Sequence, residues 1–345
     1  MDISLILNTI RANSSALYQE RVPEATKTNM QKVGNAILEY ESTTNEFLNG
    51  LVKRIAFIEV SNRRYKNPLA VLKTAGRPFG TTFEEIYVNP VKAQTFDGGE
   101  DGASQMLKVT KPDLKTIFHE KNREDKYPVS VTEVQLQDAF TSEGEFNEFY
   151  ASIMTAMYSG DEIDEYLLMR NLVSDGIANN KIKSLEVDYT GDEESSKGLI
   201  KLLKTISTDM TFPSGAFNGY NVLNADKIEA GTVTEVRTWT PKENQILLIR
   251  SDVDANTDVE VLAKAFNMDK ADLLKNKIVV DSFGDENTLC FLCDEKAFKA
   301  KDNLYKVRSF DNGSNLVTNY WLHHHQTLSM SLFANGVAIQ KKAGK

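Results

Sequence analysis

The chain has 345 residues and a mass of 38.7 kDa, which suits two or three packed units better than one small domain. Hydrophobic residues make up 41% and charged residues 26%, with only 19 glycines and 8 prolines, so collagen-like, low-complexity and wholly disordered chains are excluded. Two cysteines cannot build a disulfide framework, no apolar run reaches the roughly 20 residues of a membrane span, and the first residues lack the features of a signal peptide. We therefore expect a soluble intracellular protein that makes no membrane contact.

The charge is unevenly distributed along the chain. The net charge is −9 and the sequence pI is near 5.2, which argues against a general nucleic-acid binder, because that affinity comes mainly from Lys and Arg on phosphates. Residues 51–80, however, hold seven basic residues and one acidic residue. A basic segment on an acidic body favours self-association, in which one copy's arm lies on another copy. A solvated loop explains the charge equally well.

Residues 1–50 are expected to form a polar, partly helical arm, because they contain no compact apolar block. Two runs rich in β-branched and aromatic residues follow. The first covers 83–88 and resumes towards Phe96, and the second covers 116–131. The turn-forming sequence DGGEDG at 97–102 separates them, so we predict one long antiparallel hairpin with a mobile acidic tip. Because both strands are highly charged and have little core, this hairpin needs a neighbouring surface.

Residues 144–176 carry the strongest helical pattern of the chain. Phe146, Phe149, Ile153 and Met157 are spaced by three and four residues, as on one face of a helix. A continuous helix of this length would measure roughly 50 Å. The Gly-Asp pair at 160–161 leaves open whether the helix is split or kinked, since glycine disfavours helix and aspartate is a good cap.

The rest of the chain predicts a mixed α/β body. Strand-like runs occupy residues 184–189, 245–249, 277–283, 288–293 and 304–310, and helical patterns occupy 196–207 and 257–266. The C-terminal residues 315–340 alternate loosely and end in an apolar run. Together with the hairpin and the long helix, this order of elements predicts the α+β class.

Cys290 and Cys293 form a CxxC pair of the kind found in redox and zinc motifs. Such motifs lie at a turn or a helix start, where both sulfurs converge. Here the pair lies in an apolar, strand-like run, in which residues three apart point to opposite faces. We therefore predict two buried core cysteines rather than a reactive site.

His323, His324 and His325 are the second candidate for metal chemistry. On a strand, His323 and His325 share one face and His324 points to the other, so the three cannot bind one metal without distortion. The chain also lacks the phosphate-binding, dinucleotide-binding, zinc-protease and serine-hydrolase motifs. We expect no catalytic residue, no metal site and no cofactor.

Five stretches resemble, in their order, the major capsid (major head) proteins of tailed bacteriophages with the Hong Kong 97-like fold, closest to the short-tailed podovirus types. They are PFG (78–80) with FEEIYV (83–88), FHEKNR (118–123) with YPVSV (127–131), YSGDEIDEY (158–166), LAKAFN (262–267), and NYWLHH (319–324) ending in FAN (333–335). The resemblance rests on their order together with the predicted order of elements.

The resemblance implies five parts of the chain. They are an N-terminal arm (1–66), the extended hairpin or E-loop with its approach (67–132), a peripheral domain with a long spine helix (133–195), an α/β axial domain (196–310), and C-terminal strands that return to the body (311–345). In that family the E-loop reaches over a neighbouring subunit. The covalent cross-link of the founding member is not carried over, because no residue pattern here supports it.

The function implied by the resemblance is that of a structural shell protein. The chain would self-assemble, as hexamers and pentamers, into an icosahedral or prolate shell around a double-stranded DNA phage genome. Its partners would be further copies of itself, a separate scaffolding protein and a portal, with weak non-specific contact to the packaged DNA. It would reside in the virion after assembly in the host bacterial cytoplasm. An acidic chain fits a shell that encloses DNA without binding it tightly.

Contacts between subunits are expected where the hairpin and the basic segment meet a neighbour that is acidic on average. The candidates are Arg63, Arg64, Arg77 and Arg123, whose guanidinium groups suit bidentate pairing with carboxylates, and Glu84 and Glu85 on the hairpin. Two alternatives stay open. One is an encapsulin-like protein compartment with the same fold, and the other is a metal- or thiol-dependent enzyme that uses the histidine run and the CxxC pair.

Overall fold

The computed structural model describes residues 3–55, 64–74, 82–96, 109–132, 143–256 and 276–342. The chain divides into two compact units, the first made of Met1–Asn67, Arg123–Glu165 and Leu304–His325, and the second of Pro68–Asn122, Tyr166–Asn303 and Gln326–Lys345. Three elements contribute residues to both units: α7 (Glu143–Ala178), β8 (Phe298–Asn312) and β9 (Val317–Met330). Within the described residues, no helix combines the length and the apolar character needed to cross a membrane.

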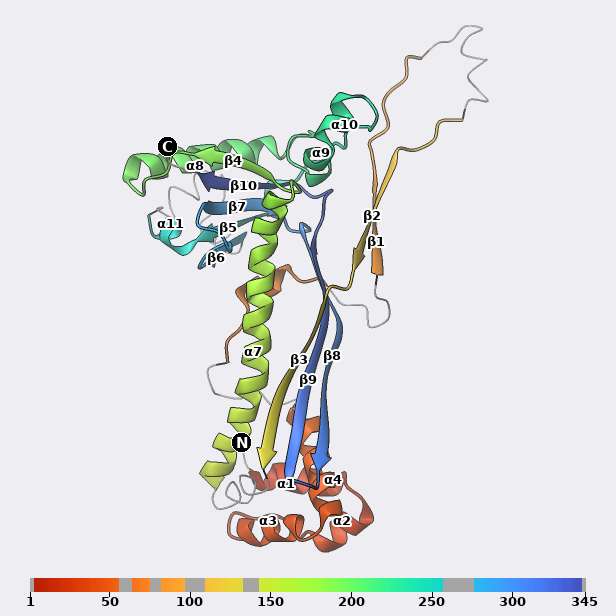
Figure 1. The fold of residues 1–345 in the computed structure, drawn as a ribbon, viewed down its shortest axis with the longest axis vertical. Helices are drawn as coiled ribbons and strands as arrows, with labels where there is room; N and C mark the ends of the chain where they lie inside the picture. The colour runs from red at the N-terminus through yellow and green to blue at the C-terminus, as the bar shows by residue number, and fades with distance from the viewer. Residues whose placement is uncertain are drawn as a thin grey trace. The chain divides into compact units, whose positions relative to one another are not determined.

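The first unit combines four short helices with a three-stranded sheet. The helices are α1 (Ile3–Ala12), α2 (Ala16–Arg21), α3 (Met30–Leu38) and α4 (Glu41–Ile55), and the sheet has the order β3-β9-β8, with β3 at Arg123–Thr132. The helices gather at the end of the sheet where β3 and β8 finish (Figure 1). The inner face of the sheet contributes Tyr320 and Leu322 to one core, shared with the helices and with Met157 of α7.

The expectation that residues 1–50 contain no compact apolar block is wrong. Ile6 and Ile10 of α1, Val33 and Ile37 of α3, and Phe47 of α4 are all buried in that core. Each short helix carries its apolar side chains about one turn apart, so no continuous run of them occurs in the sequence. The helices acquire a core only by packing together and onto the sheet.

The long helix is confirmed as a single unbroken element. α7 has 36 residues, about 54 Å at 1.5 Å per residue, and continues through Gly160 and Asp161. Asp161 does not cap a new helix, because its buried carboxylate accepts hydrogen bonds from Arg123 and His324. A side chain that binds these groups is not available to the backbone, so the capping signal has no effect.

The second unit is built on a five-stranded mixed sheet in the order β4-β10-β7-β5-β6 (Figure 1). Its strands are β4 (Lys183–Val187), β5 (Gln245–Arg250), β6 (Lys277–Val280), β7 (Thr288–Asp294) and β10 (Gly336–Lys341). The shorter elements of this unit are α8 (Glu193–Asp209), α9 (Gly219–Leu223), α10 (Ala225–Glu229), α11 (Ser251–Ala255), η1 (Pro68–Leu72) and η3 (Lys242–Asn244). The two faces of the sheet support separate cores, one with α8 and one with the Tyr166–Ala178 part of α7.

The cysteines confirm the two-faced character of β7. Cys290 packs in the core with α8, Cys293 packs in the core on the opposite face, and neither has any exposed surface. Burial raises the pKa of the Cys290 thiol to about 12, and burial together with the charge of Asp294 raises that of Cys293 well above its usual value. The predicted core role of both cysteines is therefore confirmed.

The prediction of one long hairpin is confirmed for the pairing of its first strand, but it is wrong about the length of its second strand. β1 (Thr82–Val88) pairs antiparallel with β2 (Leu114–Glu120), from Thr82 opposite Glu120 to Val88 opposite Leu114. The predicted second strand does not continue to 131, because Asn122 breaks it. The Asn122 side chain donates to the Leu328 carbonyl and accepts from the Leu328 N–H, so β3 starts as a separate strand beside β9.

Several expectations lie outside the described residues. They are the acidic tip at 97–102, the capped helix expected at 257–266, Arg63, Arg77, and the stretches 78–80 and 262–267 that contributed to the resemblance.

Gly219, the first residue of α9, has no room for a side chain. A Cβ there would lie 2.1 Å from the backbone oxygen of Lys181, so Gly219→Ala should lower the free energy of unfolding by about 2–3 kcal/mol. In α8, by contrast, a Cβ on Gly198 meets nothing within 4 Å, and Gly198→Ala should raise the free energy of unfolding by about 0.5–1 kcal/mol. Urea unfolding followed by circular dichroism measures both, and equal effects would contradict the steric explanation.

Candidate functional site

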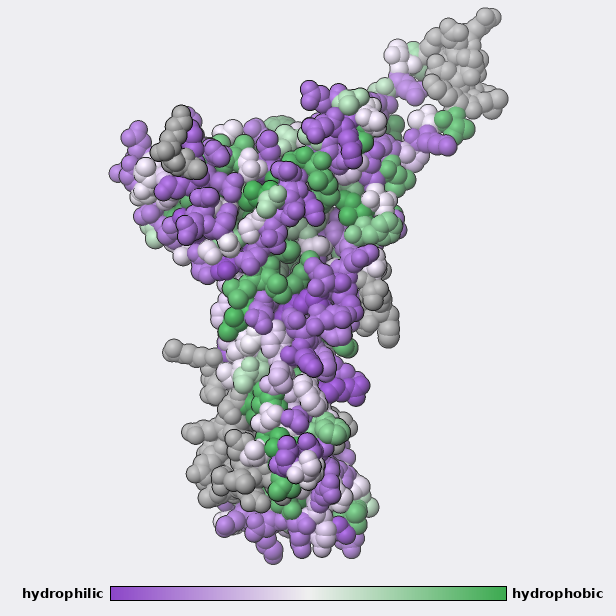
Figure 2. Space-filling model, viewed as in Figure 1, coloured by the Kyte–Doolittle hydropathy of each residue, from purple (hydrophilic) through white to green (hydrophobic). Residues whose placement is uncertain are grey.

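The β1–β2 hairpin presents two chemically different faces. Alternate residues of both strands point outward, and among them Ile86, Val88, Leu114 and Phe118 are 54%, 51%, 49% and 63% exposed. The register places Val88 opposite Leu114, and Phe118 opposite Glu84, so these side chains form one outward stripe. Apolar side chains are visible among hydrophilic ones along this arm at the upper right of Figure 2. We call Ile86, Val88, Leu114 and Phe118 the outer stripe.

The inner face of the hairpin is held by the carboxylate of Glu85. Lys299 Nζ lies 2.9 Å from Oε1, the Ser331 hydroxyl donates to the same oxygen at 2.7 Å, and His119 Nε2 lies 3.0 Å from Oε2. The His119 ring stacks on Phe83, with 4.7 Å between the centroids. Burial alone would raise the pKa of Glu85, but the hydrogen bonds from His119, Lys299 and Ser331 more than offset it, so the pKa lies below its usual value.

A second set of contacts fixes the hairpin at Tyr87 and Asn89. Tyr87 stacks on Phe333 and donates its hydroxyl to the Arg237 carbonyl. Asn89 donates to the Glu235 carbonyl at 3.0 Å and accepts from the Arg237 N–H at 3.2 Å. Beyond this point all described residues of the arm, 90–96 and 109–112, are exposed. The base of the arm is therefore fixed to the second unit, while the residues of its far part that the structure describes are exposed.

The lowered pKa of Glu85 makes its contribution to stability dependent on pH. That contribution is complete above the pKa of an unfolded glutamate, about 4.3, and is lost as the pH falls through the lower folded value. Glu85→Gln should therefore lower the free energy of unfolding by about 1–3 kcal/mol at pH 7, and the difference from wild type should shrink below pH ~4. Chemical unfolding at pH 7 and at pH 3 measures this difference.

The adjacent residue provides the matched control. Glu84 is exposed on the outward face, so Glu84→Gln should change the free energy of unfolding by less than about 0.5 kcal/mol at either pH. A deficit of Glu85→Gln that persists undiminished in acid would contradict the assigned role of the carboxylate.

Arg123 lies inside the first unit, in a cluster of buried charges. Its side chain is 3% exposed, and Nε contacts Asp125 Oδ2 at 2.7 Å. Its Nη2 contacts Asp161 Oδ1 at 2.8 Å and the Tyr127 hydroxyl at 2.7 Å. His324 Nδ1 lies 2.6 Å from the same oxygen of Asp161. The guanidinium therefore binds groups of its own chain, which the pattern of charges in the sequence could not indicate.

The other described candidates also differ in their surroundings. Arg64 pairs with Glu162 at 3.0 Å, and its guanidinium lies 4.5 Å from the centre of the Tyr158 ring. Glu85 is bound on the inner face of the hairpin, whereas Glu84 faces solvent. The structure brings Glu84 and Glu85 to one strand, on opposite faces, and places Arg64 and Arg123 in the other unit. The role of these residues, and of Arg63 and Arg77, between subunits stays a prediction.

The outer stripe was not predicted from the sequence, because the many charges of the hairpin conceal it. Ile86 and Val88 nevertheless alternate with charged or polar neighbours, in the pattern of a two-faced strand. The signal lay in combining that alternation with the register, which shows that the apolar residues of both strands share one face.

The prediction that the three histidine side chains alternate between the two faces of a strand is confirmed. On β9 the side chain of His324 is 2% exposed and contacts Asp161, while His323 and His325 share the other face, with 6.5 Å between their ring centroids. The three imidazoles therefore point to two different faces of one strand.

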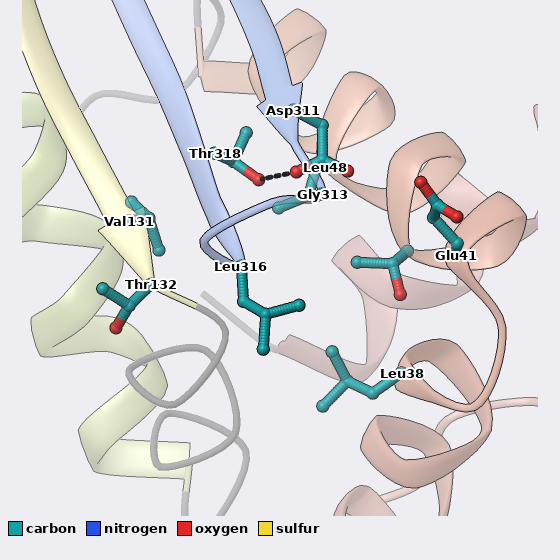
Figure 3. A pocket seen from close by; sticks show the side chains of 10 residues that line it. Leu38, Glu41, Leu48, Val131, Thr132, Asp311, Gly313, Leu316 and Thr318 are labelled. Carbon is teal, nitrogen blue, oxygen red and sulfur yellow. Dashed lines mark hydrogen bonds between the residues drawn. The ribbon is translucent and has the colours of Figure 1, made fainter.

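The first unit also contains a cavity of about 210 Å³ at the end of its sheet (Figure 3). Its apolar lining includes Leu38, Leu48 and Leu316, and the Glu41 carboxylate stands on its rim. Leu316 is 60% exposed and has φ 54°, in the left-handed region that bulky residues rarely adopt. Such strain persists only where the surrounding structure holds it.

Replacing Leu316 should relieve that strain. Asparagine tolerates the left-handed region, so Leu316→Asn should raise the free energy of unfolding by about 0.5–1 kcal/mol. Leu48 lines the same cavity but is buried, and Leu48→Ala should lower the free energy of unfolding by about 2–4 kcal/mol. Thermal unfolding of both variants compares them, and a destabilised Leu316→Asn protein would show that this side chain is needed for packing.

Solved structures with a similar fold include phage capsids. The chain matches a chain of the capsid of Staphylococcus phage Andhra with a TM-score of 0.65 at 16% identity, covering 83% of this chain and 88% of that one. It matches a chain in the structure of the head fibre and inner core protein gp22 of bacteriophage P68 with a TM-score of 0.60 at 13% identity, covering 82% and 88%. The fold is thus of the Hong Kong 97-like phage capsid class.

Sequence relatives identify the family within that class. The profile of the Phi29-like phage major capsid protein family matches residues 7–340. The major capsid protein of Bacillus phage B103 is 35% identical over 338 residues, covering 97% of this chain and 72% of the relative. That of Streptococcus phage Cp-1 is 30% identical over 350 residues, covering 96% and 92%. The chain belongs to the Phi29-like phage major capsid proteins, which confirms the predicted resemblance and does not favour the encapsulin-like alternative.

Proposed function

We propose that the chain self-assembles into the closed shell of a phage head and that the outer stripe is the surface through which each hairpin holds a neighbouring copy. The exposed outer stripe is the observation that carries this proposal. Exposing four large apolar side chains to water on one face of a fixed hairpin costs free energy, and a second copy is the partner that a shell supplies in every repeat. Glu84, on the same face, would lie within this contact.

The finer points of the proposal follow from the family. The shell is icosahedral or prolate, is built from hexamers and pentamers, and encloses a double-stranded DNA genome with weak, non-specific contact. A separate scaffolding protein and a portal take part, and assembly occurs in the host cytoplasm. The hairpin serves as the E-loop, the first unit as much of the peripheral domain, and the five-stranded sheet as the axial domain.

A structural rather than catalytic role is part of the same proposal. It is supported by the cysteine and histidine side chains that the sequence suggested for metal or thiol chemistry, because they make structural contacts within the fold. Cys290 and Cys293 lie in two separate cores, and His324 is bound to Asp161.

The outer stripe can be tested by an assembly measurement. Ile86→Asn with Phe118→Asn should leave the folded chain intact, because both side chains are more than half exposed, but should remove the apolar contact with the neighbour. Burying each large side chain is worth about 1.5–3 kcal/mol, so the concentration needed for assembly should rise at least ~100-fold. Electron microscopy and sedimentation measure particles, and circular dichroism checks the fold.

Thr116→Ser provides the control on the same face, since it removes only one methyl group beside Ile86. It should assemble at the wild-type concentration. If the double variant also forms closed particles at that concentration, the outer stripe is not the contact that holds the shell.

A further inference from the structure

The sequence contains the same reactive dipeptide, asparagine followed by glycine, at four positions. They are Asn49-Gly50, Asn218-Gly219, Asn312-Gly313 and Asn335-Gly336. In this dipeptide the glycine nitrogen can attack the carboxamide of the asparagine, because glycine has no Cβ to block the approach. The product is a cyclic succinimide, which water opens to aspartate or isoaspartate. All these pairs share the chemistry in an unfolded chain, so the fold decides which of them reacts.

The fold protects the first two pairs. Asn49 and Gly50 lie inside α4, where backbone nitrogens donate to the carbonyls of the preceding turn and the chain is held in the helical conformation. Asn218 is completely buried, and its side chain donates to the Val236 carbonyl and accepts from the Asn221 N–H. A carboxamide held by both ends cannot turn towards the following nitrogen.

The last pair is protected as well. Asn335 is 1% exposed, and its side-chain oxygen accepts a hydrogen bond from the Thr238 hydroxyl. The nitrogen that would attack, that of Gly336, donates to the Phe217 carbonyl at 2.8 Å. Both reacting groups are therefore engaged elsewhere in the second unit.

The remaining pair lies where β8 ends and an exposed turn leads to β9 (Figure 3). Gly313 and Ser314 are exposed. Oδ1 of Asn312 accepts two hydrogen bonds from Ser314, one from the backbone N–H at 3.1 Å and one from the hydroxyl at 2.8 Å. Among the residues that the structure describes, none accepts a hydrogen bond from Nδ2 of Asn312, the nitrogen that would leave.

The two hydrogen bonds from Ser314 prepare the carboxamide for attack. They draw electron density towards Oδ1, and they stabilise the negative charge that gathers on this oxygen as the nitrogen adds, as donors do in an oxyanion hole. Because they come from the residue after Gly313, they also hold the carboxamide across the intervening peptide. A side chain that is already oriented reacts faster than one that rotates freely.

We propose that Asn312 is a site of spontaneous modification, activated by Ser314, at which the folded chain converts this asparagine to aspartate or isoaspartate. The Gly313 nitrogen gives its proton to a solvent base and forms a bond to Cγ of Asn312. The bond from Cγ to Nδ2 breaks, and Nδ2 takes up a proton from water and leaves as ammonia. Water then opens the ring at either of its two carbonyls. The step is not a redox reaction, it needs only water and one folded chain, and it is independent of the proposed assembly.

The modification adds a carboxylate to a place that already has two. Asp311 directly precedes the site, and Oε1 of Glu41 lies 3.7 Å from the position that a Cβ on Gly313 would take. Like charges at this spacing repel each other. Isoaspartate also lengthens the backbone of a turn in which Leu316 is already strained. Modified subunits should therefore unfold at a lower temperature than fresh ones, and Asn312→Asp should reproduce the part of this shift that is due to charge.

Tandem mass spectrometry of the incubated protein tests the proposal. The purified folded chain is kept at neutral pH and digested at intervals with chymotrypsin, and the gain of about 1 Da is assigned to single residues. Asn312 should react at least ~10-fold faster than Asn49, Asn218 and Asn335, which become reactive only when their surroundings open. In concentrated urea the four sites should react at similar rates. Similar rates at all four in the folded chain, or an Asn312 that reacts in urea but not when folded, would overturn the proposal.

A pair of variants in the turn separates activation from exposure. Ser314→Ala removes the hydroxyl that donates to Oδ1 of Asn312, so the rate in the folded chain should fall at least ~3-fold, while the rate in urea should not change. Asn315→Ala is the matched control, because it shortens an exposed side chain of the same turn and leaves both donors of Ser314 in place. It should react like the wild type.

Equal rates at Asn312 in Ser314→Ala and in the wild type would overturn the proposal, because exposure alone would then explain the reaction. Circular dichroism checks the fold of both variants. The comparison of the four sites within the wild-type chain needs no variant, so it decides the question even if a substitution in the turn disturbs folding.

Discussion

The outward display of apolar side chains on the hairpin depends on the half-buried carboxylate of Glu85. A two-stranded ribbon has too little core to hold its own position in water. Here one carboxylate on the inner face binds Lys299, Ser331 and His119, and this polar anchor substitutes for a hydrophobic core. Because the inner face is held in this way, the outer face does not have to pack against its own chain and stays exposed.

A buried carboxylate organises the first unit as well. Asp161 binds Arg123 and His324 in the interior, so β3, α7 and β9 are tied to one another by charge as well as by apolar contact. Buried pairs of this kind contribute little net stability compared with a well-packed apolar core, but removing one partner leaves a costly unpaired charge. The cluster therefore enforces one arrangement of strand and helix, and α7 runs through Gly160 without a break.

The protein separates its charges by location, and this separation suits repeated assembly. Interior charges such as those of Arg123 and Asp161 are paired with each other, whereas Lys126 on β3 and Lys306 and Arg308 on β8 are exposed. Weak surface contacts have small individual free energies, but a closed shell repeats each of them in every subunit. Shell formation can therefore rest on apolar and electrostatic contacts that would be too weak to hold one isolated pair of subunits.

Elements with a long, regular pattern could be predicted from the sequence. The spacing of Phe149, Ile153 and Met157 indicated α7, and the strand pattern around Cys290 and Cys293 placed the two sulfurs on opposite faces, because periodicity alone decides which way neighbouring side chains point. The helices of residues 1–50 were missed as a packed group, since each is too short to show a run and their shared core exists only after folding.

Sequence by itself determined the class of fold, the long helix, the family, and the burial of the cysteines, because these follow from periodicity, composition and motif order. The tertiary structure alone decided which charges are available to a partner. Arg123 and Glu84 are equally polar in the sequence, yet the first is enclosed by Asp125 and Asp161 and the second points to solvent. The local pattern sets the direction of a side chain. Whether that side chain meets an oppositely charged group depends on residues that are distant in the chain and come together only when it folds.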